Sequence, residues 1–295
     1  MKAAPFAYER PGSLDDALAL LGDAAAAGPA GAKAIAGGQS LVPMMAMRLV
    51  RPSLLVDLAA VPGLDEIRDE GGRVHVGAMT RQRVLERWPD LGRRLPLVAA
   101  ALPWVGHREI RNRGTVGGSL AHADPAAELL LCAATLEAEL VVHGADGERT
   151  VPAAEFATGP FQTGLGPGEL LTAVRLPAAR AAEGFAFDEV ARRHGDFALC
   201  GVAVALRRRG NEVTRARVGL LGVGPAPQVH DATDVLAGER ANGAPPWAAA
   251  GEALADRLQP SGDMHASAGY RRRLARVLVA RTLERAWHDA GERTK

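Results

Sequence analysis

The chain has 295 residues, of which 47% are hydrophobic and 23% charged, and its net charge at pH 7 is +1. This composition is typical of a folded protein of roughly two domains, and a net charge so close to zero excludes the strong positive field of a general nucleic-acid binder. Its two cysteines, Cys132 and Cys200, are too few for an iron–sulfur cluster, which needs about four thiolates.

Both cysteines stand among apolar residues, so we expect buried, reduced thiols. No pair of histidines has the helical spacing of a zinc site, and we predict no metal site. No apolar run reaches the roughly 20 residues of a membrane-spanning helix. The N-terminal residues lack the apolar core of a signal peptide, and we therefore predict a cytoplasmic protein without a transmembrane segment.

The first part of the chain predicts short helices that alternate with short strands. The expected elements are a helix from Ser13 with Asp16 as its capping-box partner, a strand at 32–38, a helix capped by Ser40 that ends before Pro52, a strand at 53–58, a hairpin turning at Gly71–Gly72, and helices from Thr80 and over about 92–102.

The second part predicts one more helix and hairpin, and then a change of pattern. Asp124 and Pro125 are expected at the N-cap and first position of a helix to Leu136, and a hairpin turns at Asp146–Gly147. From about residue 180 the pattern predicts three strands, followed by helices over the last 60 residues. The final helix is amphipathic and is expected to lie on this small sheet.

Two glycine-containing segments show the same design 80 positions apart. The first is "AGGQSLVPMMAMRLV" from Ala36, and the second is "TVGGSLAHADPAAELLL" from Thr115. A glycine pair allows backbone N–H groups to come close to a ligand. A helix that begins directly afterwards adds unpaired donors and partial positive charge. Each segment therefore predicts an anion cradle, and phosphate is the usual anion.

Two such cradles would hold a pyrophosphate between them, which indicates a dinucleotide cofactor. Gln39 and Ser40 add side-chain donors, and the methionines Met44, Met45 and Met47 are expected to fill the core beneath the first cradle. Neither segment has the G-x-G-x-x-G spacing of a Rossmann fold. No Gly-Lys-Ser/Thr sequence of a Walker loop is present either.

The two segments resemble the FAD-binding motifs of the molybdenum hydroxylase flavoproteins, the medium subunits of aerobic carbon monoxide dehydrogenase and of bacterial xanthine dehydrogenase. "LGPGELLTAVRLP" from Leu165, "ARRHGDFAL" from Ala191 and "YRRRLARVLV" from Tyr270 resemble later parts of that family. The resemblance implies an α+β architecture. It consists of a two-subdomain FAD-binding fold of the vanillyl-alcohol-oxidase type over residues 1–178, and a smaller domain over 182–290 with a three-stranded antiparallel sheet and a helical bundle.

The resemblance also implies which residues bind FAD, and none of them is catalytic. Glu128 matches an acidic residue that holds the sugar or ribityl hydroxyls, Leu171 an apolar contact of the flavin or adenine, and Lys33 a lysine of some relatives. His122 and Asp124 follow the second motif and are further candidates, although Asp124 is also explained as a helix cap. The remaining predicted contacts are those of the two pyrophosphate loops: Ala36, Gly37, Gly38, Gln39, Ser40 and Leu41, and Thr115, Val116, Gly117, Gly118 and Ser119.

One stretch departs from the family pattern. Relatives often carry a lysine that reaches the flavin before the motif "ARRHGDFAL", whereas this chain has Asp188 and Glu189 there. Lys33 and Arg192 are the candidates to compensate. The segment 192–196, "RRHGD", is interpreted either as ordering the flavin edge or as an interdomain salt bridge. Arg111 and Arg113 are open to two interpretations, steering of phosphate or ordinary solvation.

The resemblance implies an FAD subunit that passes electrons from [2Fe-2S] clusters on a small partner subunit to NAD or a quinone. A large partner subunit with a molybdopterin cofactor oxidises the substrate, and the expected assembly is a dimer of heterotrimers. Carbon monoxide, purines, N-heterocycles and aldehydes all stay open as substrates. Two alternatives are a stand-alone flavin oxidase or reductase, and a nucleotide-binding assembly module without redox activity.

Overall fold

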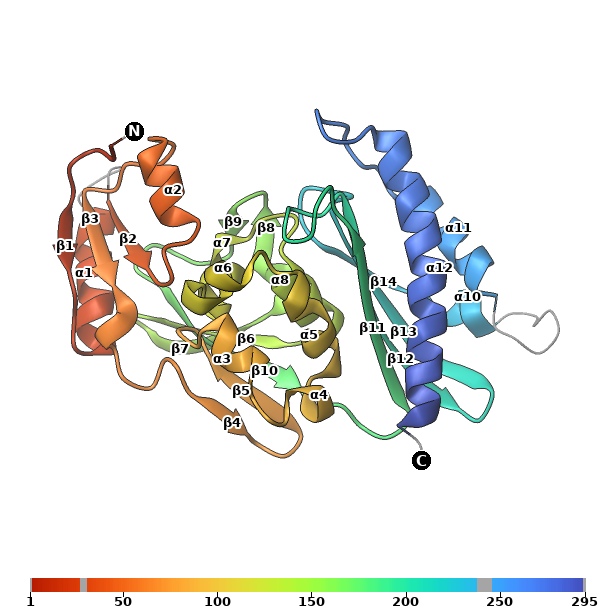
Figure 1. The fold of residues 1–295 in the computed structure, drawn as a ribbon. Helices are drawn as coiled ribbons and strands as arrows, with labels where there is room; N and C mark the ends of the chain where they lie inside the picture. Colours follow the sequence, from red (N-terminus) through yellow and green to blue (C-terminus); the bar gives the residue numbers. More distant parts are fainter. Residues whose placement is uncertain (1, 27–30, 238–245, 294–295) are drawn as a thin grey trace.

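The computed structural model describes residues 2–26, 31–237 and 246–293. The chain runs across the molecule in three successive parts (Figure 1). A small N-terminal part is followed by a central part that consists of a sheet covered by short helices. A four-stranded sheet then carries the long last helix. None of the helices in these described ranges is long and apolar enough to cross a bilayer.

The N-terminal part is a three-stranded parallel sheet in the order β1-β3-β2, with helix α1 packed against it. Ser13 begins α1 as predicted, because its Oγ accepts the Asp16 backbone N–H at 3.1 Å. Strand β1 was not predicted from the sequence. The elements are β1 (Ala7–Glu9), α1 (Leu14–Ala26), β2 (Ala32–Ile35), α2 (Leu41–Ala46), β3 (Leu54–Asp57) and the 3-10 helix η1 (Leu58–Ala60).

The central part is a five-stranded antiparallel sheet, in the order β4-β5-β10-β6-β7, with short helices above it. Both predicted hairpins are present as β4–β5 and β6–β7. Its strands are β4 (Ile67–Asp69), β5 (Arg73–Gly77), β6 (Glu139–Gly144), β7 (Gly147–Pro152) and β10 (Leu170–Pro177), with a small ribbon of β8 (Ala157–Gly159) and β9 (Gln162–Thr163).

The helices of the central part are shorter than the sequence predicts. The helix expected over 92–102 is divided, because Pro96 begins a new one. The helix expected from Thr80 begins two residues later. The helices are α3 (Gln82–Glu86), α4 (Leu91–Arg94), α5 (Pro96–Ala101), the 3-10 helix η2 (Leu102–Trp104), α6 (Arg108–Arg113), α7 (Val116–His122), α8 (Glu128–Thr135) and α9 (Ala153–Phe156).

The C-terminal part contains a four-stranded antiparallel sheet, so the prediction of three strands was wrong by one. The fourth strand, of only four residues, pairs with β13 and has too little alternation to be read from the sequence. Helix α12 lies along the sheet as predicted (Figure 1). The elements are β11 (Glu183–Val190), β12 (Cys200–Arg209), β13 (Glu212–Leu221), β14 (Gln228–Asp231), α10 (Thr233–Ala237), α11 (Trp247–Arg257) and α12 (Ala268–Glu292).

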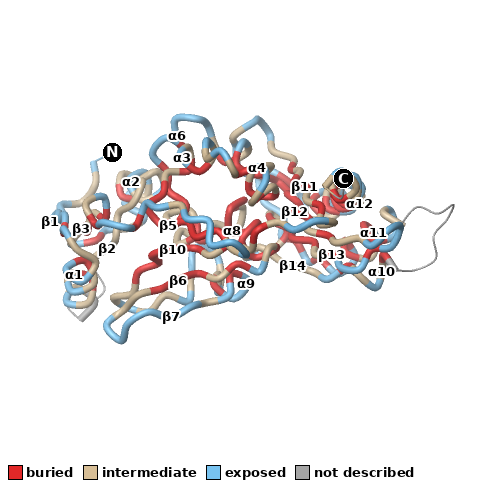
Figure 2. The backbone as a smooth tube through the Cα atoms, turned by 90° about the horizontal axis from the view of Figure 1, so that it is seen from below, coloured by how far each residue is buried: buried red, intermediate tan, exposed pale blue. Residues whose placement is uncertain are grey.

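The central part and the C-terminal sheet share one hydrophobic core. Phe187 of β11 and Leu221 of β13 belong to the same buried cluster as Leu131 of α8. The opposite face of the C-terminal sheet forms a second cluster with α11 and α12. Buried backbone accordingly runs without interruption from the central sheet into the C-terminal sheet, while β7 and β1 follow the exposed outside (Figure 2). Both cysteines are buried free thiols, as expected.

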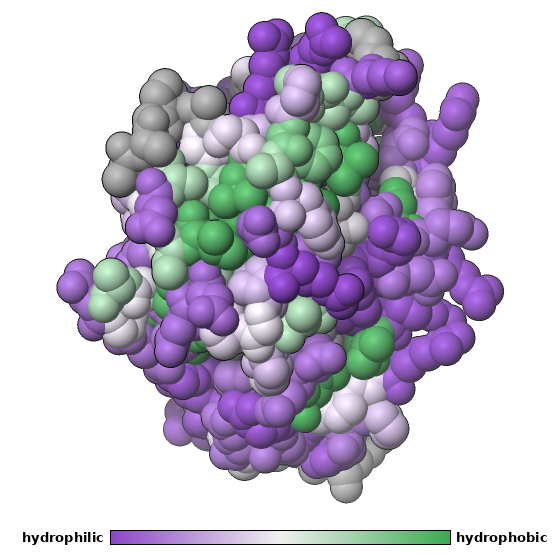
Figure 3. Space-filling view, turned by 90° about the vertical axis from the view of Figure 1, so that its left-hand side faces the viewer, coloured by the Kyte–Doolittle hydropathy of each residue, from purple (hydrophilic) through white to green (hydrophobic). Residues whose placement is uncertain are grey.

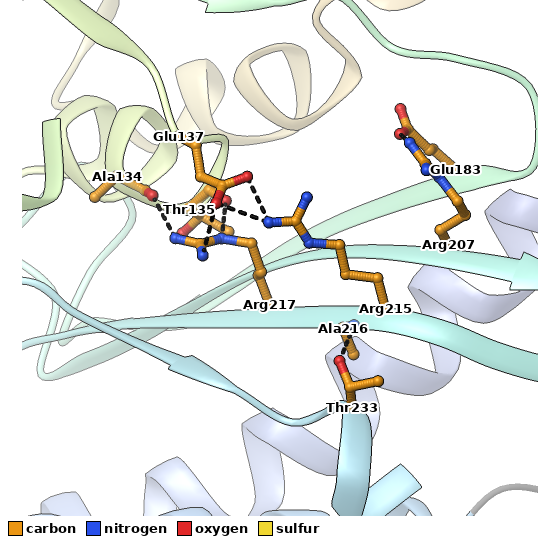
Figure 4. Close-up of polar contacts among 9 residues, drawn as sticks. All are labelled: Ala134, Thr135, Glu137, Glu183, Arg207, Arg215, Ala216, Arg217 and Thr233. Atoms are coloured by element: carbon orange, nitrogen blue, oxygen red, sulfur yellow. Dashed lines mark hydrogen bonds and ion pairs between the residues drawn. The ribbon is translucent and has the colours of Figure 1, made fainter. Parts of the chain in front are cut away.

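Polar contacts fix the C-terminal end of α8 to the C-terminal sheet. Arg217 of β13 donates from Nε to the Thr135 carbonyl at 2.9 Å and from Nη2 to the Ala134 carbonyl at 3.1 Å. Arg215 binds both carboxylate oxygens of Glu137 at 2.7 Å (Figure 4). The last carbonyls of a helix lack intrahelical donors, so the Arg217 guanidinium satisfies the end of α8, and Arg215 holds the residue Glu137 that follows it on β13.

Candidate functional site

A cleft of about 800 Å³ opens where the three parts of the molecule meet. The loop between β2 and α2 forms one wall, and α7 with the start of α8 forms the opposite wall. The loops at 163–171 and 195–197 close the remaining sides. The volume lies within the 300–1,000 Å³ range of small-molecule and cofactor sites.

All the residues predicted to bind a cofactor line this cleft, with one exception. The exception is Val116, which is 3% exposed and packs into the central core. The fold therefore brings together, in one cleft, predicted residues that are more than 130 positions apart along the chain, from Lys33 to Leu171. The lining residues from the prediction are Lys33, Ala36, Gly37, Gly38, Gln39, Ser40, Leu41, Thr115, Gly117, Gly118, Ser119, His122, Asp124, Glu128 and Leu171.

The first glycine loop exposes a run of backbone donors. The N–H groups of Gly38, Gln39, Ser40 and Leu41 have no acceptor among the residues that the structure describes. Gly38 has a positive φ of 71°, which turns the chain directly before α2. The Gln39 side chain donates to the Gly37 carbonyl at 3.0 Å and so braces the loop instead of adding a free donor.

Ser40 was predicted to cap α2 through its side chain, and this prediction is wrong. Ser40 does precede α2, but its hydroxyl makes no capping hydrogen bond and its backbone is already helical. The Ser40 hydroxyl therefore stays available on the cleft wall. The backbone N–H groups at the start of α2 are therefore free to donate hydrogen bonds to a bound ligand.

The second glycine motif is built differently from the first. Gly117 and Gly118 lie inside the first turn of α7, and Thr115 caps that helix by accepting the Gly118 N–H at 3.0 Å. The N–H groups of Val116, Gly117 and Ser119 donate to the backbone carbonyls of Thr80, Ala78 and Thr115. The prediction of two equal cradles of backbone N–H groups is therefore wrong. Among the described residues, the first loop offers a run of four free backbone donors, whereas the second motif contributes the Thr115 N–H and the Ser119 hydroxyl.

Close packing explains two of the glycines. A Cβ on Gly37 would lie 2.4 Å from the Arg113 carbonyl oxygen, and one on Gly117 would lie 2.3 Å from the Ala78 Cβ. Both distances are far below van der Waals contact. Gly37 thus allows the first loop to touch the backbone that leads into the second motif. Gly117 allows α7 to pack closely on Ala78 at the end of β5.

The segment between α7 and α8 corrects a second capping prediction. Helix α8 begins at Glu128 with Ala127 at its N-cap, so Asp124 and Pro125 do not start it. The Asp124 carboxylate instead accepts the Ala126 N–H at 2.8 Å and forms a local turn. His122, predicted in a loop, is the last residue of α7, and its ring lies 5.1 Å from that of Phe161. Burial lowers the pKa of His122, which favours a neutral ring.

Glu128 places a carboxyl group on the cleft wall at the first position of α8. It is 8% exposed, and burial raises its pKa to about 7. A carboxyl group in this position is suited to accept hydrogen bonds from ligand hydroxyls. At the far side, Leu171 lies next to an irregularity in the pairing of β10 with β6, between Leu171 and Ala173.

An ion pair holds the loop that precedes β10. Arg149 of β7 binds both carboxylate oxygens of Glu169, at 2.7 and 2.6 Å, and also donates to the Gly164 carbonyl at 2.9 Å. Glu169 in turn accepts the Gly166 N–H. The guanidinium lowers the pKa of the Glu169 carboxyl and keeps it charged. The cleft wall at 164–169 is thereby fixed from its outer side.

Two aromatic residues of the cleft were not predicted from the sequence. Phe197 comes from the loop after β11 and is 75% exposed, and Phe161 has a positive φ of 58°. The motif "ARRHGDFAL" pointed to the right loop, but no local pattern indicates that Phe197 faces a cleft made by other parts of the chain. An exposed phenyl ring in a cleft is a surface for a planar ligand.

The loop 192–196 docks by stacking and not by an interdomain salt bridge. His194 stacks on Trp104 with ring centroids 5.6 Å apart and an interplanar angle of 21°. Arg192 contacts His265 at 3.3 Å and does not line the cleft, whereas Lys33 does. Asp188 lies on the other face of β11 and pairs with Arg281 and Arg285 of α12, so only Lys33 stays a candidate for the missing lysine.

The N-terminal face also corrects the prediction for the methionines. Met45 is buried, but Met47 is 51% exposed and lies outside the core. Figure 3 shows this face of the molecule, with separate apolar patches on a largely polar surface. Exposed large apolar side chains of the N-terminal part are Phe6, Val42, Met47 and Leu49.

Arg111 is a buried structural residue, so both interpretations offered for it, phosphate steering and ordinary solvation, are wrong. Its guanidinium pairs with Glu86 at 3.3 Å and donates to the carbonyls of Val105 and Gly106 at 3.1 Å, and it does not line the cleft. Val105 and Gly106 do line the cleft, so Arg111 supports this part of the cleft wall from its buried side.

Replacing Arg111 by methionine should lower the free energy of unfolding by about 2 kcal/mol, because two carbonyls lose their donor and the half-buried Glu86 carboxylate keeps only Arg83 as an ion-pair partner. Denaturant titration of the purified chain measures this loss. The neighbouring exposed Arg113, replaced in the same way, is the control and should change stability by less than about 0.5 kcal/mol. Equal stability of both variants would contradict the supporting role.

Comparison with protein families decides what this arrangement is. Residues 4–179 match the family model of the FAD-binding domain in molybdopterin dehydrogenase. The chain belongs to this family. Residues 185–286 match the C-terminal domain of carbon monoxide dehydrogenase flavoproteins. The chain is thus an FAD-binding subunit of the molybdenum hydroxylase type, as the glycine motifs indicated.

Several similar proteins match almost the whole chain. The alpha subunit of the 6-hydroxypseudooxynicotine dehydrogenase complex of Paenarthrobacter nicotinovorans is 42% identical over 98% of this chain and 97% of its own length. The carbon monoxide dehydrogenase medium chain of Hydrogenophaga pseudoflava is 37% identical over 96% and 97%. A solved carbon monoxide dehydrogenase from the same organism superposes with a TM-score of 0.91, at 36% identity, covering 98% and 99%. Quinoline 2-oxidoreductase from Pseudomonas putida 86 gives 0.90 at 37% identity over both full chains.

Proposed function

We propose that this chain binds FAD in the cleft, with the pyrophosphate at the first glycine loop. The observation that supports this most directly is the run of four unpaired backbone N–H groups from Gly38 to Leu41 at the start of α2. Such a run binds phosphate through hydrogen bonds and through the partial positive charge of a helix start. The Ser40 and Ser119 hydroxyls add donors from the two facing walls.

The rest of the cleft fits the other parts of the same cofactor. The Glu128 carboxyl group suits the hydroxyls of a ribityl chain or ribose, and Leu171, Phe161 and Phe197 offer apolar and aromatic surface to the ring systems. Bound FAD supplies the redox chemistry. The chain's own residues bind and orient it, and none of them needs to act as a nucleophile or general base.

We further propose that FAD here accepts electrons from [2Fe-2S] clusters of a small partner subunit and delivers them to NAD or a quinone. A large molybdopterin subunit would complete a heterotrimer, two of which form a dimer. The medium-subunit relatives support this division of labour, and the two cysteines of this chain cannot hold a cluster. The location in the cytoplasm and the division of the chain at residues 178–182 stay predictions.

The first experiment is a visible absorption spectrum of the chain, purified alone and then incubated with FAD. Bands near about 370 and 450 nm that remain after desalting are expected of a protein-held flavin. Thermal unfolding should shift upward with FAD concentration, because a ligand at 100 times its Kd stabilises the native state by about 2.7 kcal/mol. Absence of flavin from the chain and from its complex with partner subunits would overturn the proposal.

Replacing Ser119 by alanine should weaken FAD binding about tenfold, since one hydrogen bond to a charged phosphate is worth about 1.5 kcal/mol or more. Fluorescence quenching of FAD titrated with protein measures the Kd. Stability should not change, because the hydroxyl has no partner among the described residues. The exposed Ser261, replaced by alanine, is the control. An unchanged Kd for the Ser119 variant would remove this residue from the phosphate site.

The same preparation tests the alternatives from the sequence. A stand-alone flavin oxidase would have its bound flavin reduced by a small substrate without any partner subunit. A nucleotide-binding module without redox activity would never retain FAD. We expect neither result, because the cleft carries donors for the cofactor's phosphates and the relatives are subunits of larger complexes.

A further inference from the structure

Two acidic residues lie buried between the central part and the C-terminal sheet without a cation. Glu128 is 8% exposed and Glu189 is 4% exposed. Both carboxyl oxygens of Glu189 are buried without a hydrogen-bond partner. In the part of the chain that the structure describes, no arginine, lysine or histidine lies within ion-pair distance of either group. A buried carboxylate in this condition is costly, so such a group holds a proton.

The two residues lie near one another beside the shared core, since the charge of Glu128 acts on Glu189. Glu189 lies two positions after Phe187 on β11, and alternate residues of a strand share a face. Phe187 packs in the cluster that contains α5 and α8, so Glu189 lies on that face of the sheet and not on the face covered by α12. Glu128 and Cys132 are one turn apart on α8, and the charges of Glu128 and Glu189 both raise the pKa of the Cys132 thiol.

The surroundings contain few other charges. On its own strand Glu189 has Asp188, whose charge is directed to Arg281 and Arg285 on the opposite face. The thiol of Cys200 is nearby on β12, and α5, which packs on β11, has no titratable residue. Glu128 has Asp124 beside it and His122, with a lowered pKa, at the end of α7. The charge of Glu128 raises the pKa of Glu189, and the charge that acts on Glu128 is that of Asp124.

We propose that Glu128 and Glu189 form a proton-storing pair, which takes up one proton when the flavin in the cleft is reduced. This inference rests on the proposed FAD site. Two electrons and one proton convert FAD to its anionic reduced form, and a second proton passes from solvent to Glu128. Reduced iron–sulfur clusters of the partner subunit, or dithionite in the experiment, supply the electrons. The added negative charge is thereby neutralised inside the protein.

The direction of the proton transfer and the pH range in which it occurs follow from the pKa values of the two carboxyl groups. Burial raises the pKa of Glu128 to about 7, and burial together with the charge of Glu128 raises that of Glu189 to about 9. At pH 8 the pair therefore holds about one proton in the oxidised protein. Negative charge added to the cleft raises the pKa of Glu128 further, so from about pH 7 upward the reduced protein binds more protons. Well below pH 7 both groups are protonated in either state, and the effect disappears.

The test is the pH dependence of the flavin midpoint potential, measured by dithionite titration of the FAD-loaded chain. One proton per two electrons changes the potential by about 30 mV per pH unit. Between pH 7 and 8.5 the wild type should be steeper than the double variant Glu128→Gln/Glu189→Gln by up to that amount. The exposed Glu155→Gln is the control and should match the wild type. Equal slopes in wild type and double variant would overturn the proposal.

A second measurement needs no FAD and so separates this inference from the proposed function. The infrared spectrum of the ligand-free chain in D2O at pH 8 should contain the C=O stretch of a protonated carboxyl group. Glu189→Gln should remove it, and Glu155→Gln should retain it. Absence of the band from the wild type would overturn the pair, even if FAD binds. Failure to retain FAD with the band present would instead overturn the cofactor site.

Discussion

Gly37→Ala should lower the affinity for FAD about 100-fold, the largest loss expected from a single added methyl group. The new Cβ would lie 2.4 Å from the Arg113 carbonyl oxygen and 2.8 Å from the Gly114 Cα. Those backbone atoms are held in place, because Gly114 donates to Ile110 and its carbonyl accepts the Gln82 N–H. The first glycine loop must therefore move, and the loss of two of its hydrogen bonds to a charged phosphate, each worth about 1.5 kcal/mol, lowers the affinity about 100-fold.

Equilibrium titration with FAD measures the effect, and denaturant titration should show a loss of about 1–3 kcal/mol in stability from the overpacking. Gly12→Ala is the matched control, because nothing lies within 4 Å of the position of its Cβ. That variant should bind FAD as the wild type does. A Gly37→Ala chain with wild-type affinity would show that the contact between the two walls does not set the position of the donors.

Arg271→Met should cause the largest loss of stability, about 3–5 kcal/mol in the free energy of unfolding. The Arg271 guanidinium is buried and donates to the carbonyls of Leu199 and Gly222 at 2.6 and 2.9 Å, and to Asp263 at 2.6 Å. Methionine fills a similar volume but leaves two buried carbonyls without a donor. Leu199 directly follows the loop that brings Phe197 to the cleft, so FAD affinity should also fall.

Chemical denaturation of the Arg271 variant measures the loss, with Arg273→Met as control. Arg273 belongs to the same helix and is exposed, and its guanidinium lies 5.9 Å from the centre of the Tyr270 ring. Its replacement should stay within about 0.5 kcal/mol of the wild type. If both variants unfold at the same denaturant concentration, the two carbonyls find other donors and the anchoring role is wrong.

The sequence predicted residues that line a single cleft, because the two glycine motifs carry their information locally. Gly37 and Gly38 precede a helix start that the pattern identifies. Glu128 lies in the helix that was expected after the second motif, and this helix begins within one turn of the predicted start at Pro125. What the pattern could not distinguish is whether a glycine approaches a ligand or another part of the chain. Gly117 looked like part of a phosphate loop, but it lies in a helix and packs on Ala78.

Other predictions failed because tertiary contacts outweigh local preference. Asp124 followed by Pro125 is a good helix start, yet the Asp124 carboxylate closes a turn, and α8 begins three residues after Pro125. Strands β1 and β14 have three and four residues and exist only through pairing with distant strands. Phe197 reaches the cleft because the C-terminal sheet packs against the central part, which no local pattern reveals.

Helix α8 is a rigid strut between two regions of the molecule. Its first residue, Glu128, lines the cleft, and its last carbonyls accept hydrogen bonds from Arg217 of β13. Eight residues of helix span about 12 Å and do not bend over that length. A change in the position of β13 would therefore act, through Arg217 and α8, on the wall of the cleft that carries the Glu128 carboxyl group.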